Sequence, residues 1–411
     1  MSGPRTIAEL RAEIPALATR GGASANARFD GPGGTQVPQS VIDAMVHYLT
    51  TSNANAHWGF PESDRSDAMV EDAREVLAAF TGGQPEEVVF GANMTTLTMH
   101  LARGLGRGWQ AGDEVIVTGL DHHANVAPWE ALAIERGIVL RWWAADPLTG
   151  ELDLTDLPGL IGPRTRLIAV GGASNALGTI TDIRTVASLA KQHGVLVLVD
   201  AVHLAAHRRL DVAALGVDFL VCSPYKFYGP HAGVLWGRHE LLERVDAPRL
   251  RPAPSTGPER LQTGTAAFEA IAGCAAAVRW LASVAGSGGT LSEQLDASFS
   301  VLEAREMVLF TQLWDGLGTI PGLRRFGLPP GPGRTATVSF TVDGHTAQAV
   351  SAILTRHGCS ASHGDFYAYT AAEVAGVLPN GWVRLGLAAY SDDTDVERVL
   401  VALKTIGAPT S

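Results

Sequence analysis

Short apolar runs recur along the chain from residue 87, and they constrain the fold more than any other feature. The clearest is VLVLV at 195–199, where five apolar residues follow one another without alternation. Such runs are typical of strands buried on both faces, and helical patterns such as Ile183–His193 separate them. The expected strands are Glu87–Phe90, Glu114–Thr118, Ile138–Trp143, Arg166–Val170, Val195–Val199, Phe219–Ser223 and Gly233–Trp236. The series predicts an α/β fold with a mostly parallel, doubly wound sheet.

The rest of the chain reads as α+β. A long amphipathic pattern over Leu291–Leu317 precedes two expected strands and two expected helices, at Thr335–Val342, Trp382–Leu387, Thr346–His357 and Thr394–Ile406. We therefore expect a large α/β domain over residues 26–285. A smaller domain should combine residues 1–25, including an N-terminal helix, with residues 286–411.

Charge and hydropathy exclude several classes of partner. The 411 residues carry 31 basic and 42 acidic side chains, a net charge of −11, without a basic stripe. Nucleic acid and anionic membranes are therefore not expected as main partners. The N-terminal residues lack the apolar core of a signal peptide, and the most apolar stretch, Ala266–Ala285, is interrupted by Glu269 and Arg279. We expect a cytoplasmic protein that does not span a membrane.

The three cysteines are odd in number and far apart. Cys222, Cys274 and Cys359 have no second Cys or His at metal-ligand spacing. They predict reduced thiols, and neither a disulfide framework nor a metal site.

Lysine is scarce, so few residues are candidates for any chemistry that needs a primary amine. Only Lys191, Lys226 and Lys404 are present among the 31 basic residues. Lys191 and Lys404 lie in helical patterns where a solvated side chain is the usual case. Lys226 lies between a buried strand and a Gly/Pro turn, where an amine can be desolvated and its pKa lowered. It is the candidate lysine for a Schiff base.

Polar residues follow the apolar runs, at the edge of the sheet where ligands bind. Asn93, Met94 and Thr95 begin a helix whose free N–H groups favour an anion such as phosphate, although a simple helix cap is the commoner role of such residues. Asp200 ends a buried strand, where a carboxylate needs a partner. It serves either as the anion beside a protonated ring nitrogen or as a structural helix cap or salt bridge. Together with Lys226, these features match what pyridoxal phosphate requires.

Several motifs in one order make the sequence resemble the class V aminotransferases of fold type I, in the cysteine desulfurase and selenocysteine lyase branch. The motifs are NANAHWG, VVFGANMTT, DHHANVAPW, SNALGT, VLVDAVH, SPYKFYGPHAG, QTGT and VRLGLAAYS. The resemblance covers nearly the whole chain. It implies the fold of type I pyridoxal phosphate enzymes, this cofactor, an amino-acid substrate and a homodimer.

The resemblance also assigns roles to residues. Lys226 corresponds to the cofactor-binding lysine, and His122 to a histidine that stacks on the cofactor ring and relays protons. The implied cofactor contacts are Asn93, Met94, Thr95, His122, Asn175, Asp200, His203, Ser223, Tyr225, Lys226, Gly264 and Thr265, the last two from the neighbouring subunit. His203 and Tyr225 replace a usual Gln and His. Arg384 corresponds to the clamp for the substrate α-carboxylate, and Asn55 and His57 belong to the expected substrate pocket.

One departure from the family bears on the reaction. Desulfurases carry a nucleophilic cysteine in a loop that here reads Gly364-Asp365-Phe366-Tyr367-Ala368, with Tyr367 in its place. A phenol cannot form a persulfide, and Cys359 lies eight residues earlier, where it is expected in the core. We therefore expect a C–S lyase that eliminates from cysteine or an S-conjugate, with Lys226, His122 and Tyr367 as catalytic residues. Aminotransferase and racemase or epimerase activity remain alternatives, as does a degenerate scaffold without activity.

Overall fold

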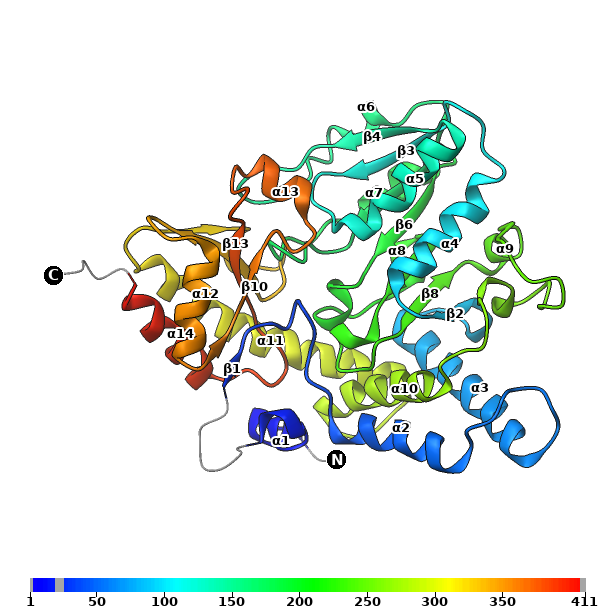
Figure 1. Ribbon diagram of the computed structural model, residues 1–411, viewed down its shortest axis with the longest axis horizontal. Helices are drawn as coiled ribbons and strands as arrows, with labels where there is room; N and C mark the ends of the chain where they lie inside the picture. The colour runs from blue at the N-terminus through cyan, green and yellow to red at the C-terminus, as the bar shows by residue number, and fades with distance from the viewer. Residues whose placement is uncertain (1–2, 19–25, 407–411) are drawn as a thin grey trace.

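A seven-stranded sheet forms the centre of the computed structural model, which describes residues 3–18 and 26–406 (Figure 1). Its strand order is β2-β8-β7-β6-β5-β3-β4, and only β8 runs antiparallel to its neighbours. The strands are β2 (Val88–Gly91), β3 (Glu114–Thr118), β4 (Val139–Trp143), β5 (Thr165–Gly171), β6 (Leu196–Asp200), β7 (Phe219–Cys222) and β8 (Gly233–Gly237). The expected mostly parallel sheet is confirmed, with each strand within two residues of its predicted bounds.

Helices cover both faces of this sheet. Successive side chains of a strand point to opposite faces, so Leu198 of β6 packs into one apolar cluster while Val197 and Val199 pack into another. The first cluster includes residues of α4 (Met94–Gly106) and α5 (Ala127–Arg136). The second includes residues of α3 (Pro61–Thr81), α7 (Ile183–Gln192), α10 (Phe268–Ala282) and α11 (Leu291–Gly318). Both faces of the sheet are therefore buried, as the continuous apolar runs require.

A second sheet belongs to the C-terminal part of the chain, on the left of Figure 1. It is antiparallel with the order β12-β13-β10-β9, and a short parallel pair, β1-β11, lies beside it. Its elements are β1 (Ala27–Arg28), β9 (Leu323–Phe326), β10 (Thr337–Val342), α12 (Ala347–Arg356), β11 (Cys359–Ser360), β12 (Ser362–Gly364), α13 (Tyr369–Val374), β13 (Trp382–Gly386) and α14 (Asp393–Lys404). The predicted smaller α+β part of the fold is confirmed.

The long helix α11 joins the two parts. Leu295 and Leu302 in its first half pack with the large sheet, whereas Leu309 and Leu313 pack with the small one. Helix α1 (Ile7–Ala12) contacts both parts, because its Leu10 belongs to the large cluster and its Arg11 pairs with Asp395 of α14 at 2.7 Å. The apolar packing therefore changes partner within α11, and the predicted boundary at residue 285 remains a prediction.

Three helices surround α10. It packs against α3, α11 and α2 (Gln39–Thr51), in the lower part of Figure 1. Among the described residues, Phe268–Ala285 is the one stretch long and apolar enough to cross a membrane by these criteria, and 61% of it is buried inside the protein. Three shorter helices lie in the connections between or after the strands of the large sheet. They are α6 (Leu157–Leu160), α8 (Val212–Leu215) and α9 (His239–Leu242).

Gly233 at the start of β8 should not tolerate a side chain. A Cβ there would lie 2.4 Å from the backbone carbon of Asn93, the residue that caps α4. Because backbone cannot move aside cheaply, Gly233→Ala is expected to lower the free energy of unfolding by at least about 2 kcal/mol. Urea denaturation followed by circular dichroism measures this change.

The matched control is Gly159→Ala in α6. No atom lies within 4 Å of a Cβ at Gly159, so alanine there should leave stability unchanged or raise it by up to about 1 kcal/mol. Equal stability of the Gly233→Ala variant and the unmodified protein would show that β8 and α4 are not in contact as described.

Candidate active site

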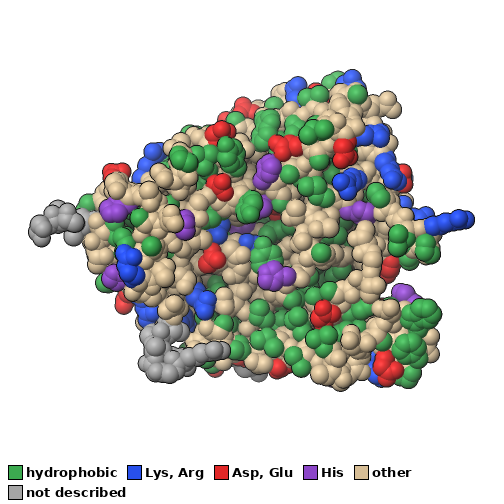
Figure 2. All heavy atoms as spheres, in the orientation of Figure 1, with side chains coloured by type: hydrophobic (Ala, Val, Ile, Leu, Met, Phe, Trp, Pro, Cys, Tyr) green, Lys and Arg blue, Asp and Glu red, His purple; other side chains and the backbone are tan. Residues whose placement is uncertain are grey.

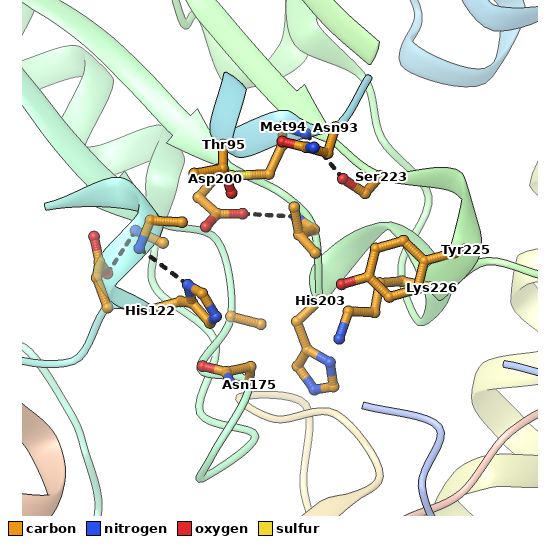
Figure 3. Close-up of a pocket in the computed structure, with 15 residues that line it drawn as sticks. Asn93, Met94, Thr95, His122, Asn175, Asp200, His203, Ser223, Tyr225 and Lys226 are labelled. Carbon is orange, nitrogen blue, oxygen red and sulfur yellow. Dashed lines mark hydrogen bonds between the residues drawn. The ribbon is translucent and has the colours of Figure 1, made fainter. Parts of the chain in front are cut away.

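One pocket opens at the carboxyl ends of the parallel strands (Figure 3). Residues from the loops after β2, β3, β5, β6 and β7 line it, as expected for the edge of a parallel sheet. The lining includes Asn93, Met94, Thr95, Asp121, His122, Asn175, Asp200, His203, Ser223, Tyr225 and Lys226. Ten of the predicted cofactor-binding residues are therefore brought together in one cavity.

Lys226 follows β7 in a short 3-10 turn, Pro224–Lys226. Its amine donates a hydrogen bond to the carbonyl oxygen of Pro32, and its Nζ lies 4.9 Å from the ring centroid of Tyr225. Burial, together with the nearby Arg384 guanidinium, lowers the pKa of Lys226 to about 8. Lys191 and Lys404 are exposed. Lys226 is therefore a buried amine that is partly neutral near neutral pH.

Asp200 ends β6 with its side chain buried in the pocket (Figure 3). One carboxylate oxygen accepts a hydrogen bond from the backbone N–H of Val202 at 2.9 Å. Burial, and to a smaller extent the neighbouring carboxylate of Asp121, raise the pKa of Asp200 to about 7. A cation placed beside it would reverse this shift, since an opposite charge favours the ionised form.

His122 presents a neutral ring to the pocket. Its Nδ1 accepts a hydrogen bond from the backbone N–H of Ala124 at 3.0 Å, which places the ring proton on Nε2. Burial, assisted by the charge of Lys226, lowers the pKa of His122 to about 4. A flat, neutral imidazole suits stacking on an aromatic ring.

The start of α4 is both capped and tied to the neighbouring strand. Asn93 is the N-cap, and its Oδ1 accepts from the backbone N–H of Thr96 at 2.8 Å. The backbone N–H of Met94 donates to the Oγ of Ser223 at 3.1 Å. The hydroxyl of Thr95 has the sulfur of Met94 as its acceptor, at 3.6 Å. Sulfur is a weak acceptor, so this hydroxyl is able to donate its hydrogen bond to an anion at the helix end instead.

Asn175 and His203 face the small domain as well as the pocket. The Nδ2 of Asn175 donates to the carbonyl oxygen of Phe366 at 2.9 Å, and its Oδ1 is buried without a partner. The Nε2 of His203 lies 3.0 Å from the Oγ1 of Thr335 and 3.2 Å from the Oγ1 of Thr337. A contact of His203 with a cofactor oxygen therefore has to coexist with, or replace, these hydroxyl contacts.

Arg384 lies on β13 at the side of the pocket. Its guanidinium donates to the carbonyl oxygen of Asn175 at 2.9 Å and to the Oγ of Ser362 at 3.1 Å, and it lies 3.4 Å from a carboxylate oxygen of Asp30. Its Nε is buried without a partner. Burial lowers the pKa of Arg384 to about 10, so it stays charged at neutral pH. A buried cation with a free donor is suited to a carboxylate.

Tyr367 projects from the loop between β12 and α13. Its side chain is 71% exposed, and its ring centroid lies 5.3 Å from that of His122. The three thiols are elsewhere. Cys359 is buried in β11, where burial raises its pKa to about 11, and burial also raises the pKa of Cys222 and of Cys274. None of the three is present as a thiolate at neutral pH.

Four predicted residues line a different groove. Asn55 and His57 lie in it together with Gly264 and Thr265. His57 pairs there with the carboxylate of Asp67, with 2.9 Å between Nδ1 and Oδ1. This groove and the Lys226 pocket have no lining residue in common. Within one chain these four residues lie apart from the Lys226 pocket. Contacts of Gly264 and Thr265 with the cofactor of a neighbouring subunit, and of Asn55 and His57 with the substrate, remain predictions.

The sequence analysis assigned no role to several residues of the site. Asp121 is buried in the pocket and accepts hydrogen bonds from Thr118, Asn125 and the backbone N–H of Gly171. Burial raises the pKa of Asp121 to about 6. Its position directly after β3, like that of Asp200 after β6, was a usable signal. Pro32 and Phe366 reach the site from distant segments, and no local signal marks them.

Comparisons with known proteins agree with this geometry. The family model for Aminotransferase class-V matches residues 28–399. A cysteine desulfurase of Serratia proteamaculans is 32% identical over 97% of this chain and 98% of its own length. A probable cysteine desulfurase of Pseudomonas aeruginosa is 34% identical over 96% of each chain. The solved apo structure of a cysteine desulfurase from Thermococcus onnurineus has a TM-score of 0.89 at 28% identity, over 99% of both chains.

The fold and the pocket are those of a pyridoxal phosphate-dependent enzyme of fold type I. The chain belongs to the class V aminotransferase family and is similar to its cysteine desulfurases. The predicted resemblance is thus confirmed, and so is the expectation of an enzyme. A scaffold without activity is not supported.

Proposed function

We propose that this enzyme is a C–S lyase that eliminates a thiol from cysteine or an S-substituted cysteine without forming an enzyme persulfide. The observation that carries the proposal is Tyr367, in the loop position where the resemblance puts the persulfide cysteine. Cys359, eight residues away, is buried in β11 with a raised pKa. A thiol in that state is a poor sulfur acceptor, because the thiolate is the reactive form.

The residues of the pocket fit pyridoxal phosphate, the cofactor that family membership implies. Lys226 supplies a partly neutral amine that can react with an aldehyde. Asp200 supplies a buried carboxylate that a cation such as a protonated ring nitrogen would stabilise in its ionised form. The start of α4 and the Thr95 hydroxyl supply donors for a phosphate. Asn175 holds a buried oxygen that lacks a partner. When bound, the cofactor would supply an electron sink for the substrate α-carbon.

Three side chains around the substrate α-carbon have separate roles in substrate binding and proton transfer. Arg384 binds the α-carboxylate through its free Nε and so orients the amino acid. Lys226, as a neutral amine, accepts the α-proton at Nζ. His122 stays neutral at pH 7 and can pass a proton through Nε2.

The proposed reaction balances with one water molecule. The substrate loses its α-proton and the Cβ–S bond, the departing thiolate takes a proton, and hydrolysis of the remaining three-carbon fragment gives pyruvate and ammonia. No oxidant or reductant is needed. Tyr367 either donates the proton to the leaving sulfur or lines the pocket.

A panel of amino acids and S-substituted cysteines tests the proposal. Keto acid, ammonia and thiol in equal amounts from the sulfur compounds support a lyase. Pyridoxamine phosphate accumulating with an amino donor would identify an aminotransferase instead. Loss of optical activity without any keto acid would identify a racemase.

Cofactor loading should report the lowered pKa of Lys226. Only the neutral amine attacks an aldehyde, so at saturating pyridoxal phosphate the rate of reconstitution is expected to rise up to about pH 8 and then level off. Stopped-flow visible absorbance measures this rate. A rate that keeps rising toward the ordinary lysine pKa of 10.5 would mean that the amine is not desolvated, and Lys226→Ala provides the blank.

A homodimer with shared sites is also proposed. Figure 2 shows hydrophobic side chains gathered at the lower right, near α2 and the loop before α3. The exposed apolar residues of this region include Val46, Leu49, Trp58 and Phe60. Trp58 lines the groove that holds Gly264 and Thr265, so burying this region in a dimer would bring these two residues to the second chain. Light scattering on the purified protein gives the oligomeric state.

A further inference from the structure

Phe366 and Tyr367, two neighbouring aromatic residues of the loop 364–368, contact residues of the candidate site. The Cζ of Arg384 lies 4.0 Å from the ring centroid of Phe366. The ring of Tyr367 lies over His122, with 5.3 Å between the centroids. The pair therefore extends from the residue that would bind the substrate carboxylate to the residue that would stack on the cofactor ring.

Hydrogen bonds from the large domain fix the backbone of both residues. The carbonyl oxygen of Phe366 accepts from Asn175 at 2.9 Å, and that of Tyr367 accepts from the backbone N–H of His123 at 2.7 Å. The backbone N–H of Tyr367 donates to the carboxylate of Asp365 at 2.8 Å. Both aromatic residues have left-handed backbone angles, with φ of 56° and 59°. Such angles are unfavourable outside glycine and persist where surrounding contacts enforce them.

The two rings leave the polar part of the site open. Phe366 lies on the face of the Arg384 guanidinium, whereas a carboxylate binds at its edge, where Nε is free. Tyr367 is 71% exposed, so most of its ring has no protein contact. An apolar group on the substrate would bury this ring surface, but a small polar thiol would leave it in water.

We propose that Phe366 and Tyr367 form a subsite for the sulfur substituent of the substrate. It selects cysteines that carry a bulky apolar or aromatic group on sulfur over cysteine itself. The proposal rests on the proposed lyase function. It assigns the ring of Tyr367, rather than its hydroxyl, the main role in specificity.

Specificity ratios provide the first test. For the holoenzyme, kcat/KM for S-benzylcysteine is expected to exceed that for cysteine by about tenfold or more, and Tyr367→Ala should lower this ratio about tenfold. Tyr367→Phe keeps the ring and should keep the ratio. Tyr369→Ala is the matched control, because Tyr369 is a nearby exposed tyrosine at the start of α13. An unchanged ratio in Tyr367→Ala, or a fall in Tyr369→Ala of the same size, overturns the subsite.

Binding of a compound that cannot react provides the second test. (Benzylthio)acetate has the carboxylate and the thioether but no amino group, so calorimetry reports binding without turnover. Tyr367→Ala should weaken it about tenfold and leave (methylthio)acetate nearly unchanged. Equal effects on both compounds contradict the proposal. Absence of keto acid from every sulfur amino acid would instead refute the lyase function, and the binding comparison would still decide the aromatic subsite.

Discussion

Replacing Lys226 with alanine is expected to abolish activity and covalent retention of the cofactor. The structure places the amine in the pocket with a pKa of about 8, and the other two lysines are exposed. Loss of the proton acceptor alone costs about 10²- to 10⁴-fold, and loss of the attachment to the aldehyde adds to it. Turnover should therefore fall at least about 10³-fold. The visible absorbance of the reconstituted protein should disappear after dialysis.

Lys191→Ala is the matched control for this change. It removes an exposed lysine of α7, so both turnover and absorbance should remain. A Lys226→Ala variant that keeps the dialysis-resistant absorbance of the reconstituted protein would remove the basis of the site described above.

Replacing Arg384 with alanine is expected to lower kcat/KM by about 10²- to 10³-fold, because truncating one side of a buried charge pair costs about 2–5 kcal/mol. Most of the loss should appear in KM if Arg384 only binds the carboxylate. Arg384→Lys keeps the charge but loses the planar fork and its stacking on Phe366, so it should recover only part of the loss.

Two further measurements separate binding from folding in the Arg384 variants. The guanidinium also donates hydrogen bonds to Asn175 and Ser362. A thermal melt therefore shows whether the substitution has lowered the stability of the fold. The visible spectrum of the bound cofactor should stay unchanged. A kcat/KM within threefold of the unmodified enzyme would exclude Arg384 as the carboxylate clamp.

The large sheet could be predicted from the sequence because its strands are buried on both faces. Runs such as 195–199 carry that signal in a few consecutive residues, and the polar residues that follow them carry the site. Helix α3 was not predicted, although Pro61 at its first position and Gly82 after its end mark its limits. The short strands β9, β11 and β12 have two to four residues each, too few to show a periodicity.

The parts of the site that the sequence did not reveal come from distant segments. Ser362 and Phe366 reach Arg384 through the pairing of β12 with β13 in the small sheet, and Pro32 reaches Lys226 from 194 residues earlier in the chain. The hydroxyl contacts of His203 with Thr335 and Thr337 arise where the small domain packs on the large one. Resemblance to a family assigned positions for cofactor and substrate, but it gave no information on how Phe366 and Tyr367 approach the pocket.

The products formed from L-cysteine test the central claim most directly. Elimination predicts pyruvate, ammonia and sulfide in equal amounts, no alanine, and no sulfur atom added to the protein in its intact mass. Cys359→Ala should give the same result, since a buried thiol takes no part. Alanine as the main product, together with a protein-bound sulfur that disappears in Cys359→Ala, would contradict the account and make the enzyme a desulfurase.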